Sequence, residues 1–256
     1  HIKNFVCPSC GAQIITDDTT AATFCYYCHN PTILPSQLSG VYKPSKIIPF
    51  LFEKKQVTNI FYKWCKKKPL LPSDFRSQSQ VEKLTGVYVP YWLYDCDING
   101  RLSASAKQVR SWTTGNTRYT ETKIYDVYRE IFASFDRVPV DGSRRADDDL
   151  MEKLEPFDYS QIKDFSMSYL SGYLAEKYDM DSKSAFPRIE QRVKEYSYKL
   201  LRDTISGYSS VSEKGCQIDL ANINAEYALL PTWMLTYNYK QKRYFFAMNG
   251  QTGKIA

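Results

Sequence analysis

Histidine is scarce in this chain, which has only His1 and His29 among its 256 residues. Serine-hydrolase triads and His-bearing zinc hydrolase sites are therefore excluded. The chain also lacks a Gly-x-Ser-x-Gly elbow. The segment from Gly250 to Lys254 lacks the four residues between glycines that a phosphate-binding loop needs, so we interpret it as a turn after a strand. We find no recognisable catalytic group and predict that the protein is not an enzyme.

Long apolar runs are also missing. No segment approaches the roughly 20 consecutive apolar residues of a membrane-spanning helix. Charged residues make up 24% and hydrophobic residues 43% of the chain, which is typical of a soluble globular protein. The chain starts without methionine and stops at Ala256, just after a turn signal, so we expect a fragment of a longer protein. The sequence leaves open whether membrane segments follow Ala256.

Cysteine spacing gives the clearest chemical signal. Two Cys-x-x-Cys pairs occur within the first thirty residues, and a hairpin between them would bring their two turns together. Four soft thiolates in a tetrahedron leave no open position for a substrate, which is typical of a structural zinc ribbon. We predict one structural zinc ion held by the thiolates of Cys7, Cys10, Cys25 and Cys28. Gly11 and Asn30, which follow the two pairs, are expected to adopt left-handed backbone conformations.

Other uses of these cysteines stay open. Two disulfides would need an oxidising compartment, whereas the odd total of seven cysteines favours reduced thiols. Cys65, Cys96 and Cys216 lie within apolar stretches, where we interpret them as small buried hydrophobic residues. A Cys-x-x-Cys redox site is a further alternative, and His29 could replace one of the four ligands.

The net charge of +6 is concentrated in one segment. Between residues 53 and 68, six lysines stand against one glutamate, so this segment holds five of the six excess positive charges. The lysines are Lys54, Lys55, Lys63, Lys66, Lys67 and Lys68. One interpretation is a solvated helix face whose last lysines complement the helix dipole. The other is a contact surface for nucleic acid or anionic lipid.

Hydrophobic spacing predicts three helices. The first covers 53–68, and its buried face carries Val57, Ile60, Phe61, Trp64 and Cys65. Before it, the proline-rich residues 31–49 are interpreted as a linker. A second helix is expected over 159–178, with Asp158 as its N-cap. The third covers 185–206, and its buried stripe carries Ile189, Val193, Tyr196 and Leu200.

Strands are expected where valine, isoleucine, tyrosine and tryptophan are frequent. Those over 86–98, 101–110 and 118–135 are interpreted as an antiparallel meander, and further strands are expected over 215–221, 226–239 and 243–249. Asn99-Gly100 predicts a hairpin turn between the first two strands.

These elements predict an α+β fold with an N-terminal four-cysteine zinc ribbon. The ribbon and linker cover 1–40, a first helix-on-antiparallel-sheet unit covers 41–145, and a second, with an added helix, covers 146–256. Val89-Pro90-Tyr91-Trp92-Leu93 and Leu230-Pro231-Thr232-Trp233-Met234 share a Pro-x-Trp motif behind a helix and ahead of a hairpin. This similarity predicts a degenerate duplication. Chance similarity between aromatic-rich strands is the alternative.

Several segments resemble one bacterial family. They are the two cysteine pairs, Lys43-Pro44 with Ile47-Ile48-Pro49-Phe50, Gly86–Tyr94, Val140–Ser143, Glu155–Asp158, Tyr169–Asp179 and Met248–Lys254. Over nearly its whole length the chain is similar to the proteins described as transcription factor IIB-type zinc-ribbon-containing, which also carry the label primosomal helicase-like. The chain lacks the nucleotide-binding loop and the motor of a helicase.

The resemblance implies a function without catalysis. Family members commonly carry membrane helices after the Asn-Gly-Gln-Thr-Gly-Lys turn, and some are encoded near envelope-stress proteins of the phage-shock type. This implies a cytoplasmic adaptor at the inner face of the cell membrane, linked to it by segments beyond this chain. Its partner would be a protein, such as an envelope-stress component. The alternative is a nucleic-acid-binding accessory factor that uses the ribbon and the lysine-rich helix.

Overall fold

The described residues form two sheets, and the larger contains strands from both ends of the sequence. The structure is a computed structural model that describes residues 2–25, 28, 30–68, 71, 75, 77–144, 146–239 and 242–256. The smaller sheet consists of β1 (Ile2–Val6) and β2 (Gln13–Asp17). The larger contains β3 (Thr20–Phe24), β4 (Pro31–Ile33), β5 (Lys46–Ile47), β6 (Thr85–Thr114), β7 (Thr117–Asp141), β8 (Lys163–Asp164), β9 (Leu174–Glu176), β10 (Ser210–Tyr239) and β11 (Lys242–Asn249).

Helices are interspersed among these strands, so the mixed α+β class is confirmed. The α-helices are α1 (Lys54–Lys66), α2 (Gln78–Val81), α3 (Asp148–Lys153) and α4 (Ser182–Asp203). The 3-10 helices are η1 (Pro35–Leu38), η2 (Gly40–Tyr42), η4 (Tyr159–Gln161) and η5 (Met167–Leu170).

The larger sheet is mixed, and residues 86–98 and 101–110 lie in the single strand β6, so the predicted three-stranded meander was wrong. Its strands follow the order β4-β3-β9-β6-β10-β5-β8, with β11 beside β10 and β7 beside β6. The pairs β5–β10 and β9–β6 are parallel and join segments far apart in the chain. Strands as short as β5 and β9 show no periodicity, which is why the sequence pattern did not reveal them.

The chain divides into two compact units that are each discontinuous in sequence. Unit 1 contains His1–Leu93, Pro139–Ala185 and Glu226–Ala256, and unit 2 contains Tyr94–Val138 and Phe186–Ala225. The predicted boundaries at residues 40 and 145 both fall within the sequence limits of unit 1.

In unit 1, α1 covers part of the sheet as its hydrophobic spacing predicts. A capping box between Glu53 and Gln56 begins this helix. Val57, Phe61 and Cys65 are buried, and they share a core with residues of β10 and β11, including Trp233, Leu235, Phe246 and Met248. Ile60 and Trp64 are partly buried against the same core. The predicted apolar face is therefore confirmed.

Two tryptophans in unit 1 make equivalent hydrogen bonds. The indole Nε1–H of Trp92 on β6 donates to the carbonyl oxygen of Met180 over 2.9 Å, two residues before α4. The indole Nε1–H of Trp233 on β10 donates to the carbonyl oxygen of Phe52 over 3.1 Å, two residues before α1. Each bond satisfies a buried polar group and fixes the point at which a helix begins.

Backbone contacts around the two Pro-x-Trp motifs also occur twice. The N–H groups of Gly142 and Gly250 donate to the carbonyl oxygens of Pro90 and Pro231 respectively, each over 2.8 Å. The parallel pairs share one register, because β9 meets β6 at Val87 and β5 meets β10 at Ala228, each three residues before the motif's proline.

Residues 159–178 do not form the predicted α-helix. They form η4, β8, η5 and β9 instead. The Asp158 side chain does accept an N–H bond, from Ser160, but it caps only the three-residue η4. Gly172, with a φ of +86°, interrupts the segment, and β8 and β9 use its backbone for sheet pairing. Ile162 and Leu174 pack against the core of unit 1.

The segment 31–49 is packed rather than a free linker, so that interpretation was also wrong. It contains β4, η1, η2 and β5. Leu34, Leu38, Ile47 and Ile48 are all buried. The segment is therefore part of unit 1. Its prolines are compatible with these short elements, because proline suits first turns and strand edges as well as linkers.

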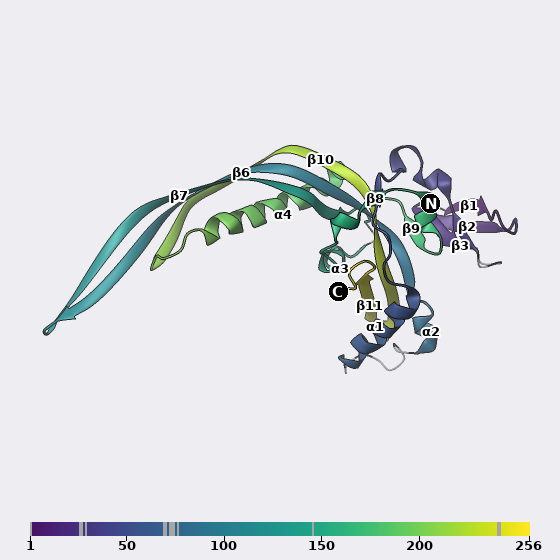
Figure 1. Cartoon of the computed structure of the whole chain (residues 1–256), viewed down its shortest axis with the longest axis horizontal. Helices are drawn as coiled ribbons and strands as arrows, with labels where there is room; N and C mark the ends of the chain where they lie inside the picture. The colour runs from purple at the N-terminus through teal and green to yellow at the C-terminus, as the bar shows by residue number, and fades with distance from the viewer. Residues whose placement is uncertain are drawn as a thin grey trace. The chain divides into compact units, whose positions relative to one another are not determined.

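In unit 2, α4 lies along one face of the sheet that β6, β7 and β10 form (Figure 1). The helix is confirmed, but half of its predicted stripe was wrong. Ile189 and Val193 are buried, whereas Tyr196 and Leu200 are exposed. Ser197 and Leu201 take the buried positions, because the contact continues at a spacing of four residues and the Ser197 hydroxyl donates to the carbonyl oxygen of Val193.

The predicted hairpin at Asn99-Gly100 is absent, because β6 continues through both residues. A β-carbon at Gly100 would lie 2.9 Å from Ile131 Cγ2 and 3.1 Å from Leu201 Cδ1. This glycine thus permits close packing between the strand and α4, which is the other common use of glycine within a strand.

Replacing Gly100 by alanine should therefore destabilise the protein by about 1–3 kcal/mol, because the added methyl group overpacks the α4 contact. The matched control is Gly215→Ala on β10, where a β-carbon would meet only Ser103 Oγ at 3.9 Å. Urea unfolding of both variants measures the difference. Equal stability of the two variants would contradict this role for Gly100.

Candidate metal centre

Each predicted cysteine pair lies in the loop of a β-hairpin. In the first hairpin, β1 and β2 pair up to Val6 and Gln13, and the N–H of Cys7 donates to the carbonyl oxygen of Ala12 over 2.8 Å. In the second, β3 and β4 pair up to Phe24 and Pro31, and the N–H of Cys25 donates to the carbonyl oxygen of Asn30 over 2.9 Å. The two loops are thus closed by the same hydrogen bond.

The four thiols converge on one point. Their sulfur atoms all lie within 4.8 Å of one another. Cys7 Sγ lies 3.8 Å from Cys28 Sγ, and Cys10 Sγ lies 3.6 Å from Cys25 Sγ. A tetrahedron with metal–sulfur bonds of about 2.3 Å has sulfur separations of roughly 3.8 Å, so these four residues fit a single metal ion.

Two of the four cysteines in this cluster are buried. Cys7 and Cys25 are buried, Cys28 is partly exposed and Cys10 is exposed. None of the seven cysteines forms a disulfide, and the sulfur separations in the cluster far exceed the roughly 2.05 Å of a disulfide bond. Cys65 and Cys96 are buried as predicted, whereas Cys216 is exposed on β10, contrary to prediction.

The first of the two turns contains the left-handed residue that the sequence predicts. Gly11 has a φ of +74°, as predicted, and its N–H donates to the carbonyl oxygen of Cys7 over 2.9 Å. The left-handed conformation predicted for Asn30 stays a prediction, because its φ depends on residue 29, which lies outside the described residues. The position after the second cysteine of that pair belongs to His29, which lies outside the described residues, as does its role as an alternative ligand.

The thiols of Cys7 and Cys10 differ in pKa because their surroundings differ. The backbone N–H of Cys10 stabilises the thiolate of Cys7 and lowers the pKa of Cys7 to about 6. The backbone N–H of Ala12 favours the Cys10 thiolate, but burial and the neighbouring sulfur atoms together raise the pKa of Cys10 to about 12. Four adjacent thiolates repel one another, so a cation is needed before all four can ionise together.

Thr32 adds a contact that the cysteine motif did not reveal. Its side chain is buried, and its hydroxyl Oγ1 lies 3.9 Å from Cys7 Sγ. Hydroxyl groups beside a metal ligand orient it and tune its basicity. The residue lies on β4, and only the pairing of this strand with β3 brings it to the cluster.

The second hairpin also belongs to the larger sheet. β3 pairs with β9 through Ala22 and Ala175, and the N–H of Lys177 donates to the carbonyl oxygen of Thr19 over 2.9 Å. The turn before β3 is fixed by Asp17, whose Oδ1 accepts hydrogen bonds from Thr19 and Thr20. The cysteine cluster is therefore tied to the body of unit 1.

The six lysines proposed to contact an anionic partner are all exposed. They do not act alike. Lys54 Nζ donates to the carbonyl oxygen of Glu82 over 2.8 Å, whereas Lys68 Nζ lies 5.7 Å above the ring of Trp64. At 100° per residue, Lys55, Lys63 and Lys66 lie opposite the buried face of α1.

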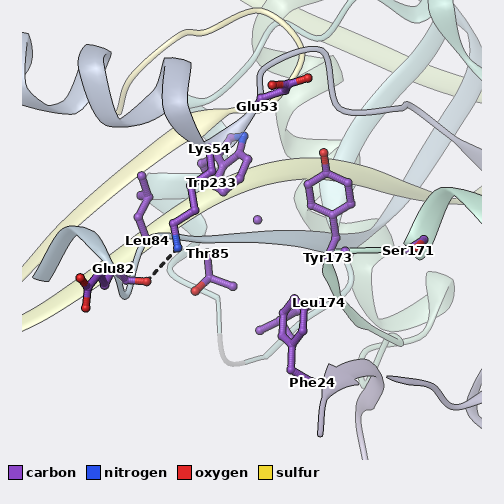
Figure 2. Close-up of a pocket in the computed structure, with 12 residues that line it drawn as sticks. Phe24, Glu53, Lys54, Glu82, Leu84, Thr85, Ser171, Tyr173, Leu174 and Trp233 are labelled. Carbon is purple, nitrogen blue, oxygen red and sulfur yellow. Dashed lines mark hydrogen bonds between the residues drawn. The ribbon is translucent and has the colours of Figure 1, made fainter. Parts of the chain in front are cut away.

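A cleft of about 670 Å³ lies beside the start of α1 (Figure 2). Its lining combines Glu53, Lys54 and Glu82 with the rings of Tyr173 and Trp233, and it includes Phe24, the residue before Cys25. Burial, and to a lesser degree the charge of Glu53, raise the pKa of Tyr173. With carboxylates on both sides of its one lysine, this cleft does not favour an anionic ligand.

Comparison with known proteins gives one informative similarity. Over 223 residues the chain is 40% identical to Uncharacterized protein YdjG of Bacillus subtilis (strain 168). The match covers 87% of this chain and 65% of the relative's length. No family model and no solved structure match the chain. Among the helices of the described residues, none is long and apolar enough to cross a membrane.

Removing the hydroxyl of Thr32 should weaken metal binding. We expect Thr32→Val to lower the affinity for a metal ion by about tenfold, the scale of other contacts to metal ligands. Competition against a chromophoric chelator measures this affinity. Thr16→Val is the control, because the Thr16 hydroxyl donates to the carbonyl oxygen of Asp17. Equal affinities in the two variants would show that Thr32 does not support the ligand.

Proposed function

We propose that this protein is a non-enzymatic zinc-ribbon adaptor that binds protein partners in the cytoplasm, at the inner face of the cell membrane. The observation that carries this proposal is the convergence of four cysteine sulfurs in two hairpin loops joined to the unit 1 sheet. The membrane link, through segments beyond this chain, and an envelope-stress component as partner both rest on the family resemblance.

Zinc is the proposed ion because of the ligand set. Four thiolates in a tetrahedron suit zinc, and they leave no position at which a substrate or a catalytic water could bind. The ion would thus stabilise the two hairpins. The burial of Cys7 and Cys25 supports a structural role, because a buried ligand pair limits access to the ion.

We also infer that the two sets of helix, Pro-x-Trp strand and following strand arose by duplication. The repeated tryptophan and glycine hydrogen bonds support this, as does the shared register of the two parallel strand pairs. The first set comprises β5, α1, β6 and β7, and the second comprises β9, α4, β10 and β11. β5 pairs with the second set and β9 with the first, so the sets exchange their short strands.

A nucleic-acid-binding accessory factor is the second candidate. The observation in its favour is the exposed lysines on and just after the last turn of α1, where they also complement the helix dipole. Sequence readout in the grooves would need base-reading side chains as well as phosphate contacts. The adaptor is favoured because this helix offers lysine without arginine.

Purified protein should contain about one zinc ion per chain, and Cys10→Ser should lose it. Because structural zinc in small modules supplies on the order of 10 kcal/mol of folding free energy, the two hairpins should unfold in this variant. The body from about residue 45 should remain folded, since its cores contain none of the four ligands. Elemental analysis and thermal unfolding measure both effects.

Cys216→Ser is the matched control, because it removes an exposed thiol from outside the cluster. It should keep both its zinc and its stability. Wild-type protein without zinc, or equal zinc in the two variants, would contradict the ribbon.

The lysines distinguish the two candidate functions. We expect weak or no binding of DNA or RNA at about 0.15 M salt, where charges are screened beyond roughly 8 Å. Binding to DNA, RNA and anionic vesicles is compared for wild type and for a variant with Lys66, Lys67 and Lys68 changed to Gln. A variant with Lys163, Lys183 and Lys199 changed to Gln loses the same charge elsewhere. Submicromolar nucleic-acid binding abolished by the first triple change alone would make the accessory factor the better proposal.

A further inference from the structure

The strand β7 has one side without a sheet partner. In unit 2 it pairs with β6, and β10 lies on the other side of β6. Among the described residues no strand pairs with the outer edge of β7. A long open edge is a template for pairing with another strand, and proteins usually protect such edges with charges, prolines or bulges.

On this edge, three exposed apolar side chains alternate with the charged side chains of Asp126 and Glu130. Ile124 is 67% exposed, Tyr128 is 57% exposed and Phe132 is 71% exposed. They share one face of β7 because they are spaced by even numbers of residues. The opposite face carries Val127 and Ile131, which pack in the core beneath α4. The three exposed side chains therefore project from the face that the helix leaves open.

The backbone of the same residues points outward. β6 and β7 are joined by the two-residue turn Gly115-Asn116, and Gly115 has the positive φ, +61°, that the first position of a type II′ turn requires. In such a hairpin Thr114 and Thr117 are a hydrogen-bonded pair, so odd-numbered residues of β7 bond to β6.

Side-chain contacts confirm that this register continues along the strands. Ser111 Oγ lies 3.0 Å from Thr120 Oγ1, and Arg101 Nε lies 2.9 Å from Glu130 Oε1. The even-numbered residues of β7 thus direct their N–H and C=O groups to the open edge. These are the residues that also carry the exposed apolar side chains.

We propose that a second copy of this chain pairs with β7 in antiparallel orientation, around a two-fold axis at Tyr128. The pattern is symmetric about that residue, because Ile124 and Phe132 each lie four positions away. Pairing would place Ile124 opposite the partner's Phe132 and the two Tyr128 rings side by side. Aromatic and β-branched cross-strand pairs are among the stabilising combinations in sheets.

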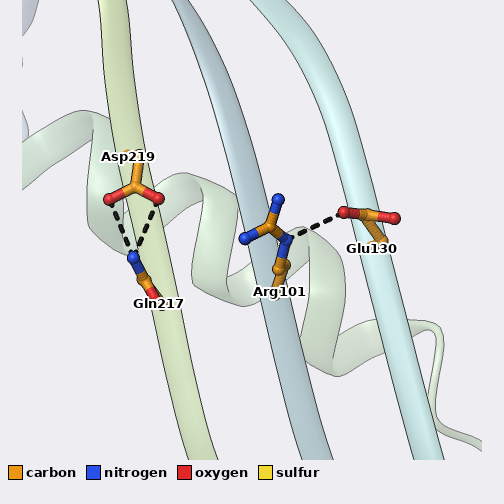
Figure 3. A network of polar contacts seen from close by, with 4 residues as sticks. All are labelled: Arg101, Glu130, Gln217 and Asp219. Atoms are coloured by element: carbon orange, nitrogen blue, oxygen red, sulfur yellow. Dashed lines mark hydrogen bonds and ion pairs between the residues drawn. The ribbon is translucent and has the colours of Figure 1, made fainter.

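The charges beside this row are already neutralised within each copy. Pairing would bring Asp126 opposite the partner's Glu130, and like charges in that position are destabilising. However, Asp126 forms an ion pair with Lys214, and Glu130 forms one with Arg101. Figure 3 shows Arg101 and Glu130 projecting from neighbouring strands, with the helix behind them. In each copy, the two negative charges of Asp126 and Glu130 are thus matched by the two positive charges of Lys214 and Arg101.

A second copy fits this edge better than an unrelated strand. Pairing with a strand of another protein requires only that β7 expose apolar residues. Pairing of two identical strands around a two-fold axis also requires that the side-chain pattern be the same in both chain directions, as it is around Tyr128. Pairing from Ile124 to Phe132 would form about ten backbone hydrogen bonds, the usual number for a stable protein–protein interface. This inference does not depend on the metal centre.

The first test is the solution mass of wild type and of Tyr128→Lys, measured by sedimentation equilibrium over a range of concentrations. We expect a dimer for wild type and a loss of dimer affinity of at least tenfold for the variant, because the two-fold axis doubles every substitution. Leu200→Lys is the control, since it replaces an exposed apolar residue on α4 and should remain dimeric. Circular dichroism checks that both variants fold.

The second test fixes the register. The variants are made in a Cys216→Ser background, which keeps the exposed Cys10, so its own cross-linking is the baseline. Above this baseline, Tyr128→Cys should join two chains through a short thiol-specific cross-linker, whereas Thr122→Cys should not, because its opposite residue would be the partner's Ser134. A wild-type monomer at all concentrations would overturn the proposal and leave the edge for a different strand. So would a dimer that cross-links equally at both positions, since it would use another surface.

Discussion

The N-terminal part of this protein depends on keeping four sulfur atoms within 4.8 Å of one another although they belong to hairpins of different sheets. β1 and β2 pair only with each other among the described strands, so the first hairpin is held to the second chiefly through the cysteine cluster and its small apolar core. The second hairpin has additional support, because β3 pairs with β9 in the large sheet. A metal ion would stabilise both hairpins at once, since four thiols without a metal offer no comparable attraction. In the adaptor that we propose, the large sheet would thus position the ribbon, and the metal ion would hold its two hairpins together.

The remainder of unit 1 relies on polar contacts that occur twice. In each Pro-x-Trp strand, the indole N–H of the tryptophan donates to a backbone carbonyl just before a helix. The carbonyl oxygen of each motif's proline accepts a hydrogen bond from a glycine N–H. Glycine is needed at position 250, because a β-carbon there would lie 2.5 Å from the Phe50 ring and 2.9 Å from Pro231 Cβ. Unit 2 is built differently. There α4 covers one face of the sheet, and residues 107–126 of the β6–β7 hairpin are exposed on both faces.

Sequence patterns predicted the parts of the structure that depend on local chemistry. Cysteine spacing identified the residues that converge, because a Cys-x-x-Cys turn needs no distant information, and helical periodicity identified α1 and α4. Long-range pairing was not predictable in this way. Residues 159–178 have the hydrophobic spacing of a helix, yet their backbone pairs with β5 and β6. Gly100 has the sequence context of a turn, but it lies within β6, where Leu201 of α4 packs close to it. Thr32 was missed for the same reason, since only strand pairing brings it to Cys7.

The most direct test of the account is the metal environment itself. X-ray absorption at the zinc edge of the purified wild-type protein reports both the identity of the ion and its ligands. The account predicts four sulfur ligands at about 2.3 Å and no bound water. A spectrum with nitrogen or oxygen ligands in place of sulfur, or no zinc signal at all, would contradict the four-cysteine ribbon and with it the proposal that this chain is a zinc-ribbon adaptor.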